Sequence, residues 1–257
     1  MKFVNAILFS NFWISIGAVG ATIFYYKFTT EKINYFYLTV VFFATLFSYN
    51  LQYISEHKTN NHRKIQTNWI LENHKFLKYV TILALILSII LSLLILPINS
   101  LFVSLPFLSV VFFYKKGKLN NFALRNIPIL KIILIALCWM FACTIMPSII
   151  AQKSIVWRPT IYLFLYIISI TLPFDIRDYF ADDKSLLSIP HLIGIKPTYV
   201  LSILILCFLI VTNFFNLSLM FFLIFTILTV LLSYKISSEY YYLIVLDGLL
   251  IILPFFV

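Results

Sequence analysis

The segment Trp157–Asp183, WRPTIYLFLYIISITLPFDIRDYFADD, joins a long apolar run to a cluster of aspartates. The run extends to Phe174 and shows no strict alternation of apolar and polar residues. Because a bilayer offers no water to backbone polar groups, such a run predicts a membrane-spanning helix. The aspartates stand at its end, so one segment indicates both the fold class and the place of the chemistry.

The composition of the whole chain supports a membrane protein. Of 257 residues, 62% are hydrophobic and 11% charged, and the mean hydropathy is +1.01. Soluble domains are about half apolar and about a quarter charged. We therefore expect an all-α, polytopic membrane protein in which residues 1–257 form a single transmembrane domain. About nine spans are predicted, near Phe3–Tyr26, Ile33–Ile54, Phe76–Leu96, Ile98–Phe113, Asn126–Ile150, Trp157–Phe174, Thr198–Phe214, Leu217–Tyr234 and Tyr240–Val257.

Basic residues predict the orientation of these spans. Most of the lysines and arginines, from Lys2 to Lys235, fall on one side of the predicted membrane. The other side has only Lys27, Lys32, Lys153 and Arg158. The positive-inside rule then places the N-terminus in the cytoplasm and the C-terminus outside the cell (inner) membrane. The net charge of +10 has this topological explanation, so no nucleic-acid partner is expected.

The acidic cluster holds four of the nine carboxylates, Asp175, Asp178, Asp182 and Asp183. Acids grouped beside a bilayer repel one another, which indicates either a bound cation or basic groups packed against them. If the helix continues through the cluster, its first three acids share one face. Such a face suits Mg²⁺, which takes oxygen ligands, better than zinc. The alternative is a solvated helix end whose acids pair with Arg177, Lys184 or the lysines of neighbouring loops.

The stretch DIRDYFADDKSLLSIPHLIG (175–194) resembles the second aspartate motif of the UbiA-type membrane prenyltransferase superfamily. Members show D-x-x-D-x-x-x-D, then a basic residue, a Thr-Leu-Pro-like turn and a glycine. Here Asp175, Asp178 and Asp182 fill the acidic positions, Lys184 follows, and Ser-Ile-Pro stands for the turn. The resemblance extends to the expected helix count, and it implies helices arranged around a central cavity.

The family's first motif is degenerate in this chain. In the family it is an Asn at the end of the second span, with Asp at the fourth and eighth positions after it. Here Asn50 matches, whereas Ile54 and Lys58 stand at the acidic positions. Basic side chains that bind phosphate directly would replace the missing acids. The residues assigned to the diphosphate are Asn50, Lys58, Arg63, Lys116 and Lys184.

The resemblance implies an enzyme that transfers a prenyl group from an isoprenoid diphosphate to an apolar acceptor, aromatic or lipid, within the membrane. Asp175, Asp178 and Asp182 would hold Mg²⁺, and Asp178 and Asp182 would be catalytic. The expected partners are the diphosphate donor, the acceptor and membrane lipid. One alternative is a catalytically inactive relative that binds lipid or acts as a scaffold. Another is a cation transporter, although transport favours paired acids at mid-membrane rather than at a helix end.

Two features lie outside these motifs. Asp247 interrupts the last span, LIVLDGLLIIL, and a charge at that depth is either functional or a structural partner, for instance of Lys131. Lys131 itself is expected to reach toward the headgroups. In the first span Gly17, Ala18, Gly20 and Ala21 predict a face for close helix contact.

Overall fold

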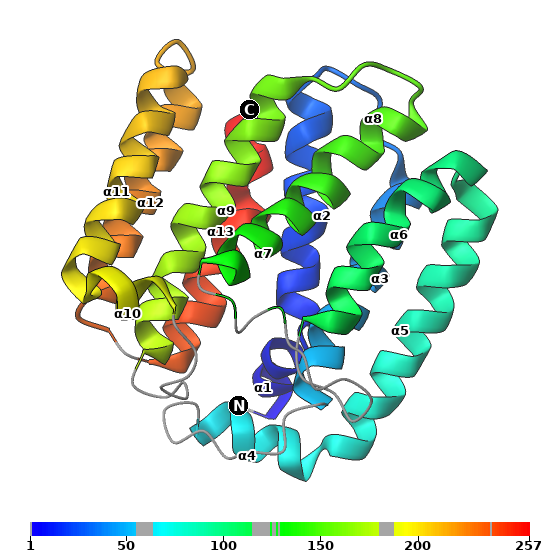
Figure 1. Cartoon of the computed structure of the whole chain (residues 1–257), viewed down its shortest axis with the longest axis horizontal. Coiled ribbons are helices and arrows are strands. Elements are labelled where there is room, and N and C mark those ends of the chain that lie inside the picture. Colours follow the sequence, from blue (N-terminus) through cyan, green and yellow to red (C-terminus); the bar gives the residue numbers. More distant parts are fainter. Residues whose placement is uncertain are drawn as a thin grey trace.

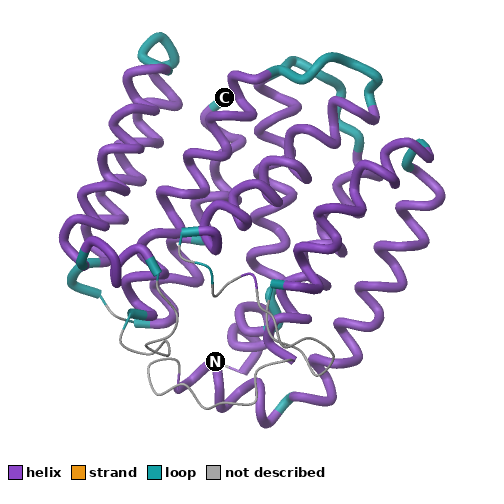
Figure 2. The backbone as a smooth tube through the Cα atoms, viewed as in Figure 1, coloured by secondary structure: helices purple, strands orange, loops and turns teal. Residues whose placement is uncertain are grey.

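The structure, a computed structural model, describes residues 2–54, 64–114, 124, 127, 129–179, 188–236 and 238–257. These residues are mostly helical, with short turns and loops, and contain no strand, which confirms the predicted all-α fold (Figure 2). The helices are α1 (Lys2–Phe9), α2 (Phe12–Phe28), α3 (Tyr35–Ile54), α4 (Lys64–Glu72), α5 (His74–Ile95), α6 (Ile98–Phe113), α7 (Leu130–Met140), α8 (Met146–Ile150), α9 (Trp157–Asp178), α10 (Ile189–Ile193), α11 (Ile195–Thr212), α12 (Leu217–Ser233) and α13 (Gly248–Ile252).

The long helices run alongside one another as a bundle (Figure 1). Helix α9 packs between α7 and α11, α2 packs on α3 and α13, and α3 packs on α5. The short helices α1, α4 and α10 gather at one end of the bundle with the N-terminus, and the C-terminus lies toward the other end (Figure 1). The acidic end of α9 is therefore at the N-terminal end of the bundle.

Burial differs between the inner and the outer helices. By length and composition α5, Leu130–Ile150, α9 and α11 qualify as membrane spans, and the bent pair of α1 and α2 would make a fifth. Three shorter apolar helices accompany them in the described part of the chain. In the most apolar window of α9 67% of the residues are buried, against 11% in α5. Apolar side chains that face outward are expected where lipid is the solvent. The count of nine spans stays a prediction.

The predicted continuous first span, Phe3–Tyr26, is wrong in one respect. It is broken after Phe9, and α1 and α2 meet at an angle of 54°. Asn11 occupies the break in a left-handed conformation, with φ of 64°. Asparagine tolerates positive φ better than most residues do, so a break at this position costs little.

A helix that the sequence did not predict lies in the polar stretch after the second span. Helix α4 begins at Lys64, where its backbone N–H groups need acceptors outside the helix. Glu239 supplies them, accepting from the N–H of Ile65 at 3.2 Å and from that of Gln66 at 2.9 Å. This buried glutamate ties the α4 segment to the residues just before the last helical segment, Tyr241–Phe256.

The predicted small-residue face of the first span is confirmed. Gly17 and Gly20 lie on α2 against α13. A Cβ atom at Gly20 would lie 2.3 Å from the carbonyl oxygen of Leu250, too close for the two helices to keep their spacing. The absence of side chains at these glycines therefore sets how near α13 approaches α2.

Candidate active site

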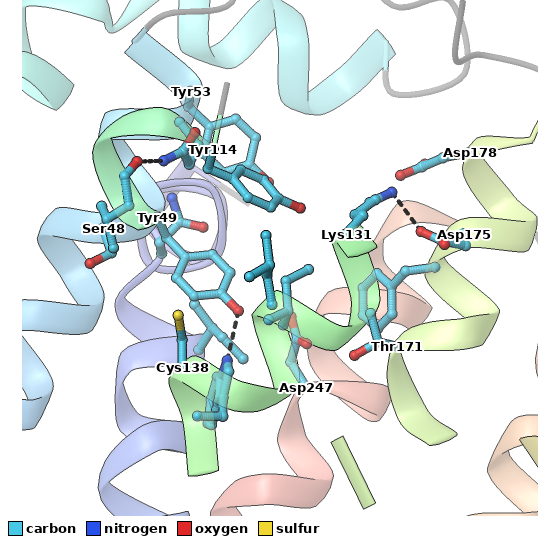
Figure 3. A pocket seen from close by; sticks show the side chains of 18 of the residues that line it. Ser48, Tyr49, Tyr53, Tyr114, Lys131, Cys138, Thr171, Asp175, Asp178 and Asp247 are labelled. Atoms are coloured by element: carbon cyan, nitrogen blue, oxygen red, sulfur yellow. Dashed lines mark hydrogen bonds and ion pairs between the residues drawn. The ribbon is translucent and has the colours of Figure 1, made fainter. Parts of the chain in front are cut away.

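A cavity of about 270 Å³ opens within the bundle (Figure 3). Its walls come from α2, α3, α6, α7, α9 and the segment around Asp247, elements that are distant in sequence. Tyr49 and Tyr53 face it from α3, Lys131 from α7, and Asp175 from α9. The packing of α9 against α7 brings the predicted acidic site to one wall of this cavity.

The acidic wall is made by two of the predicted metal ligands. Asp175 and Asp178 stand three residues apart at the end of α9, and only 2% and 4% of their surfaces are exposed. The Lys131 Nζ lies 2.5 Å from Oδ1 of Asp175. Arg177 donates to Asp178 from Nε at 2.9 Å and from Nη2 at 3.3 Å. Both acids are therefore paired with basic side chains, and both also line the cavity.

Arg177 is held by aromatic rings as well as by its carboxylate. Its guanidinium lies 5.1 Å from the ring centre of Phe174 and 5.0 Å from that of Tyr242. Both distances are within the range of cation–π attraction. Helix α9 and the last helical segment together therefore fix the cation beside Asp178.

Asn50 lies just behind the cavity wall. It is fully buried, and its Oδ1 accepts a hydrogen bond of 2.7 Å from Nδ2 of Asn11, a residue that lines the cavity. Within the described ranges the Nδ2 of Asn50 has no hydrogen-bond partner. Its neighbours on α3, Tyr49 and Gln52, contact the cavity directly. Helix α3 near Asn50 and the acidic end of α9 therefore border one space, and Asn50 is hydrogen-bonded to Asn11 on its wall.

The remaining predicted residues lie outside the described part of the chain. They are Asp182 of the metal set and four residues assigned to the diphosphate, Lys58, Arg63, Lys116 and Lys184. The described part of α9 ends at Asp178, so the predicted helical continuation to Asp182 also lies outside it. Their assignments stay predictions.

Sequence analysis missed the place of Lys131. It was expected to reach toward the headgroups or to pair with Asp247, whereas its ammonium meets Asp175, 44 residues away in the chain. The sequence did contain a signal that Lys131 has a special role, because this lysine is the second residue of an otherwise apolar helix. Its partner depended on how α7 packs against α9, and the local sequence does not specify that.

The described residues present an oxygen donor set compatible with Mg²⁺. Magnesium in phosphate-binding sites is typically held by one or two carboxylates together with substrate oxygens and water. Asp175 and Asp178 supply such a pair at the cavity wall. Within the described ranges no three acidic, His or Cys side chains converge, so Asp182 or the substrate would have to complete the ligand shell.

Away from the acids, the cavity is largely aromatic and aliphatic. Trp139, Phe174 and Tyr49 contribute rings, and the Trp139 indole donates to the Tyr49 hydroxyl at 3.1 Å. Asp247 projects into this space and is labelled with its neighbours in Figure 3. The cavity therefore has a charged wall at the end of α9 and an apolar part that carries one further carboxylate.

Comparison with known proteins identifies the fold. The structure is similar to that of a UbiA homolog from Archaeoglobus fulgidus bound to GPP and Mg²⁺, with a TM-score of 0.62 and 13% sequence identity over 98% of each chain. A second structure of such a homolog, bound to DMAPP and Mg²⁺, gives a TM-score of 0.57 and 14% identity over 98% of this chain and 97% of that one. No family model matches this chain, and no curated protein matches it in sequence. The chain has the UbiA-type membrane prenyltransferase fold.

Proposed function

We propose that this protein transfers a prenyl group from an isoprenoid diphosphate to an apolar acceptor inside the membrane. The observation that carries the proposal is the cavity with Asp175 and Asp178 on its wall, in a chain whose fold is shared with UbiA homologs bound to GPP or DMAPP and Mg²⁺. Both ligands are allylic isoprenoid diphosphates. An allylic diphosphate bound with Mg²⁺ therefore suits a cavity wall that carries the carboxylates of Asp175 and Asp178.

The charged wall would bind the diphosphate end of the donor. Asp175 and Asp178 would hold Mg²⁺, which when bound neutralises charge on the departing diphosphate. Lys131 and Arg177 stand beside them with fixed positive charge. With acids missing from the first motif, these two cations would share the task of binding phosphate oxygens. Lys58, Arg63, Lys116 and Lys184 keep their proposed diphosphate roles.

The apolar part of the cavity would receive the prenyl chain and the acceptor. Loss of diphosphate leaves positive charge on the allylic carbons, and this charge must be kept from water. The faces of Tyr49, Trp139 and Phe174 line the space and would stabilise the charge by cation–π attraction. Asp178 and Asp182 remain the proposed catalytic acids.

The test is turnover of GPP or DMAPP by purified protein with Mg²⁺, measured as diphosphate release and as prenylated product. Asp178→Ala should lower turnover by about a hundredfold or more, because it removes a ligand of the leaving group's metal. Thr171→Val is the matched control, since Thr171 lines the same cavity and its hydroxyl already bonds within α9 to Ile167. Equal activity in the Asp178 variant would remove this carboxylate from the mechanism.

A second candidate is a non-catalytic relative that binds lipid or acts as a scaffold. The observation in its favour is that Asp175 and Asp178 are already paired with Lys131 and Arg177. Those pairs would then be structural, and the cavity would be a lipid site. Absence of turnover across allylic diphosphates of several chain lengths, with intact folding, would favour this function.

We also propose that the protein spans the cell (inner) membrane with its N-terminus in the cytoplasm. The described basic residues support this orientation, because most lie at the end of the bundle that holds the N-terminus and the acidic end of α9. The proposed diphosphate site would then be reached from the cytoplasm, where a water-soluble diphosphate group is available.

A further inference from the structure

The outer face of α5 lies outside the cavity and takes no part in the chemistry proposed for it. Helix α5 stands at the edge of the bundle and packs on α3 (Figure 1). Its buried residues recur every three or four positions along the face toward α3: Leu77, Thr81, Ala84 and Ser88. The opposite face is exposed along the helix, although α5 has the length and hydropathy of a membrane span. This face therefore meets lipid.

Along this exposed face the side chains change from basic to aromatic to apolar. Lys75 and Lys78 come first, Tyr79 follows with 74% of its surface exposed, and Ile82 and Ile86 continue the face. At about 100° per residue, Lys75, Tyr79, Ile82 and Ile86 lie within about 60° of one another around the helix axis, and Lys78 lies about 60° from Lys75. The rise from Lys75 to Ile86 is about 16 Å, close to half of the roughly 30 Å hydrocarbon core of a bilayer. The order of side chains therefore matches the order of headgroup, interface and acyl chain in one leaflet.

The two lysines of this face are not neutralised by the protein. Among the residues that the structure describes, Lys75 and Lys78 have no ion-pair or hydrogen-bond partner. Glu72, the acid nearest to them in the sequence, is exposed three residues before Lys75 and does not pair with it. Two like charges within one turn repel each other, so an anion bound between them would be stabilising.

Basic residues assigned to the opposite side of the membrane are used differently. Lys27 donates to the carbonyl of Pro254 at 2.8 Å, and Lys153 lies 2.5 Å from Glu31. Arg158 donates to the carbonyl of Thr212 at 3.2 Å. Three of the four basic residues on that side are therefore bound by the protein itself, whereas the two on α5 remain available for a ligand.

The lysine end of α5 is held by aromatic contacts with the short helices of the same end. The ring of Phe76, next to Lys75, lies 6.4 Å from that of Trp69 on α4, edge to face. Trp69 in turn lies 5.9 Å from Phe9 on α1. Aromatic pairs at these distances are attractive. The two ammonium groups therefore project from a helix end whose position is fixed by α4 and α1.

We propose that the outer face of α5 is a binding site for an anionic phospholipid. The phosphate would lie on Lys75 and Lys78, since lysine binds phosphate as a point charge. Tyr79 would lie at the depth of the headgroups, where tyrosine is enriched, and the acyl chains would cover Ile82 and Ile86. Lysines beside a membrane span attract anionic lipid, whereas a zwitterionic lipid offsets its own phosphate with an ammonium. The site lies outside the cavity, so the inference does not depend on the proposed prenyl transfer.

Two features favour a lipid over a second copy of this chain on the same face. A two-fold axis along the membrane normal would bring Lys75 and Lys78 of both copies to the same depth, so like charges would face each other. Helices that associate in a bilayer also use small residues at their contact, whereas this face presents Ile82, Ile86 and Ile89. Flexible acyl chains cover such branched side chains without requiring a fitted surface.

The test compares the binding of phosphatidylglycerol and phosphatidylcholine with identical acyl chains to the purified full chain, by native mass spectrometry from detergent. The first phosphatidylglycerol should bind about tenfold more tightly than phosphatidylcholine, because two lysines act on its net charge. The double variant Lys75→Gln, Lys78→Gln should lower this preference to about twofold or less. Equal binding of the two lipids by the wild-type protein overturns the proposal, and so does an undiminished preference in the double variant.

The matched control removes the same charge from the same end of the bundle. Lys196 and Lys235 are exposed and belong to the same basic side, but they stand on separate elements. The double variant Lys196→Gln, Lys235→Gln should keep the wild-type preference for phosphatidylglycerol. An equal loss in both double variants would mean that diffuse charge attracts the lipid, and it would overturn the site on α5.

Further measurements on the wild-type protein locate the lipid and exclude other occupants. Phosphatidylglycerol with a photoreactive group in its acyl chain should crosslink to residues 79–90, and crosslinks confined to other helices would contradict the proposal. Millimolar inorganic phosphate should not displace the lipid, because it lacks the acyl chains that cover Ile82 and Ile86. Displacement by phosphate, or a dimer that forms in place of the lipid-bound monomer, would also overturn it.

Discussion

At the scale of single residues, the cavity is organised by charges from helices far apart in sequence. Lys131 of α7 meets Asp175 of α9, and Arg177 meets its neighbour Asp178. The first pair is the more informative, because it joins two helices through residues 44 positions apart and involves the almost fully buried Asp175. Its carboxylate depends on a cation for its charge to be tolerated there.

Removing one member of this pair should be more costly than removing both. We expect Lys131→Met to lower the free energy of unfolding by about 3 kcal/mol, because it takes a cation from a buried carboxylate. The double variant Lys131→Met, Asp175→Asn should lose about 1–3 kcal/mol less unfolding free energy than the two single variants lose in sum. Unfolding in detergent, followed by circular dichroism, measures all three variants.

The control is an ion pair of equal length in an exposed setting. Lys153 lies 2.5 Å from Glu31, and 58% of its side-chain surface is exposed. Because water screens exposed pairs, Lys153→Met should cost less than about 1 kcal/mol. Strict additivity in the Lys131–Asp175 cycle would show that the two side chains are not coupled.

At the scale of helices, two contacts hold the last helical segment in place. Gly20 lets α13 approach α2, and Glu239 ties the start of α4 to the residues just before that segment. Neither contact touches the cavity, but both fix the element that carries Asp247 and Leu243 into it.

Gly20→Ala should destabilise the protein by about 1–3 kcal/mol, because its Cβ would meet a backbone oxygen at 2.3 Å and force α2 and α13 apart. Thermal unfolding in detergent tests this expectation. Gly248→Ala is the control on the partner helix, since its Cβ would meet Trp13 at an ordinary 3.5 Å. A Gly20 variant as stable as the Gly248 variant would refute the close-contact role.

Glu239→Ala should loosen α4 without unfolding the bundle. Two backbone N–H groups at the start of α4 would lose their acceptor, a loss comparable to that of a helix cap, about 0.5–2 kcal/mol. Hydrogen–deuterium exchange should then quicken at residues 65–68. The exposed neighbour Ser238 serves as control, and Ser238→Ala should leave this exchange unchanged. Unaltered protection of α4 in the Glu239 variant would contradict the capping role.

At the scale of the whole molecule, the distribution of charge predicts how the bundle lies in a membrane. Lys75, Lys78, Lys196 and Lys235 belong to the basic side, and Lys27, Lys32, Lys153 and Arg158 to the opposite side. The N-terminus and C-terminus lie toward different ends of the bundle, in agreement with an odd number of crossings (Figure 1).

Reporter fusions in a bacterial inner membrane test this orientation. Alkaline phosphatase, which is active only outside the cytoplasm, should be active when fused after Val257 and inactive when fused after Ser238. A fluorescent protein at the same positions should give the reverse pattern, because the positive-inside rule keeps the Lys235 turn in the cytoplasm. A fluorescent C-terminal fusion would contradict the proposed topology.

The amino-acid sequence was enough to predict the all-helical membrane fold, most helix bounds within a few residues, and the acidic end of α9. Those features follow from contiguous residues, since hydropathy and helix periodicity act over one segment at a time. Helix packing was needed to show that Lys131 pairs with Asp175, that Asn50 bonds to Asn11 on the cavity wall, and that Asp247 lines the cavity with Tyr49 while its carboxylate has no hydrogen-bond or ion-pair partner among the described residues. These contacts join residues tens to hundreds of positions apart, so they form only when whole helices pack against one another.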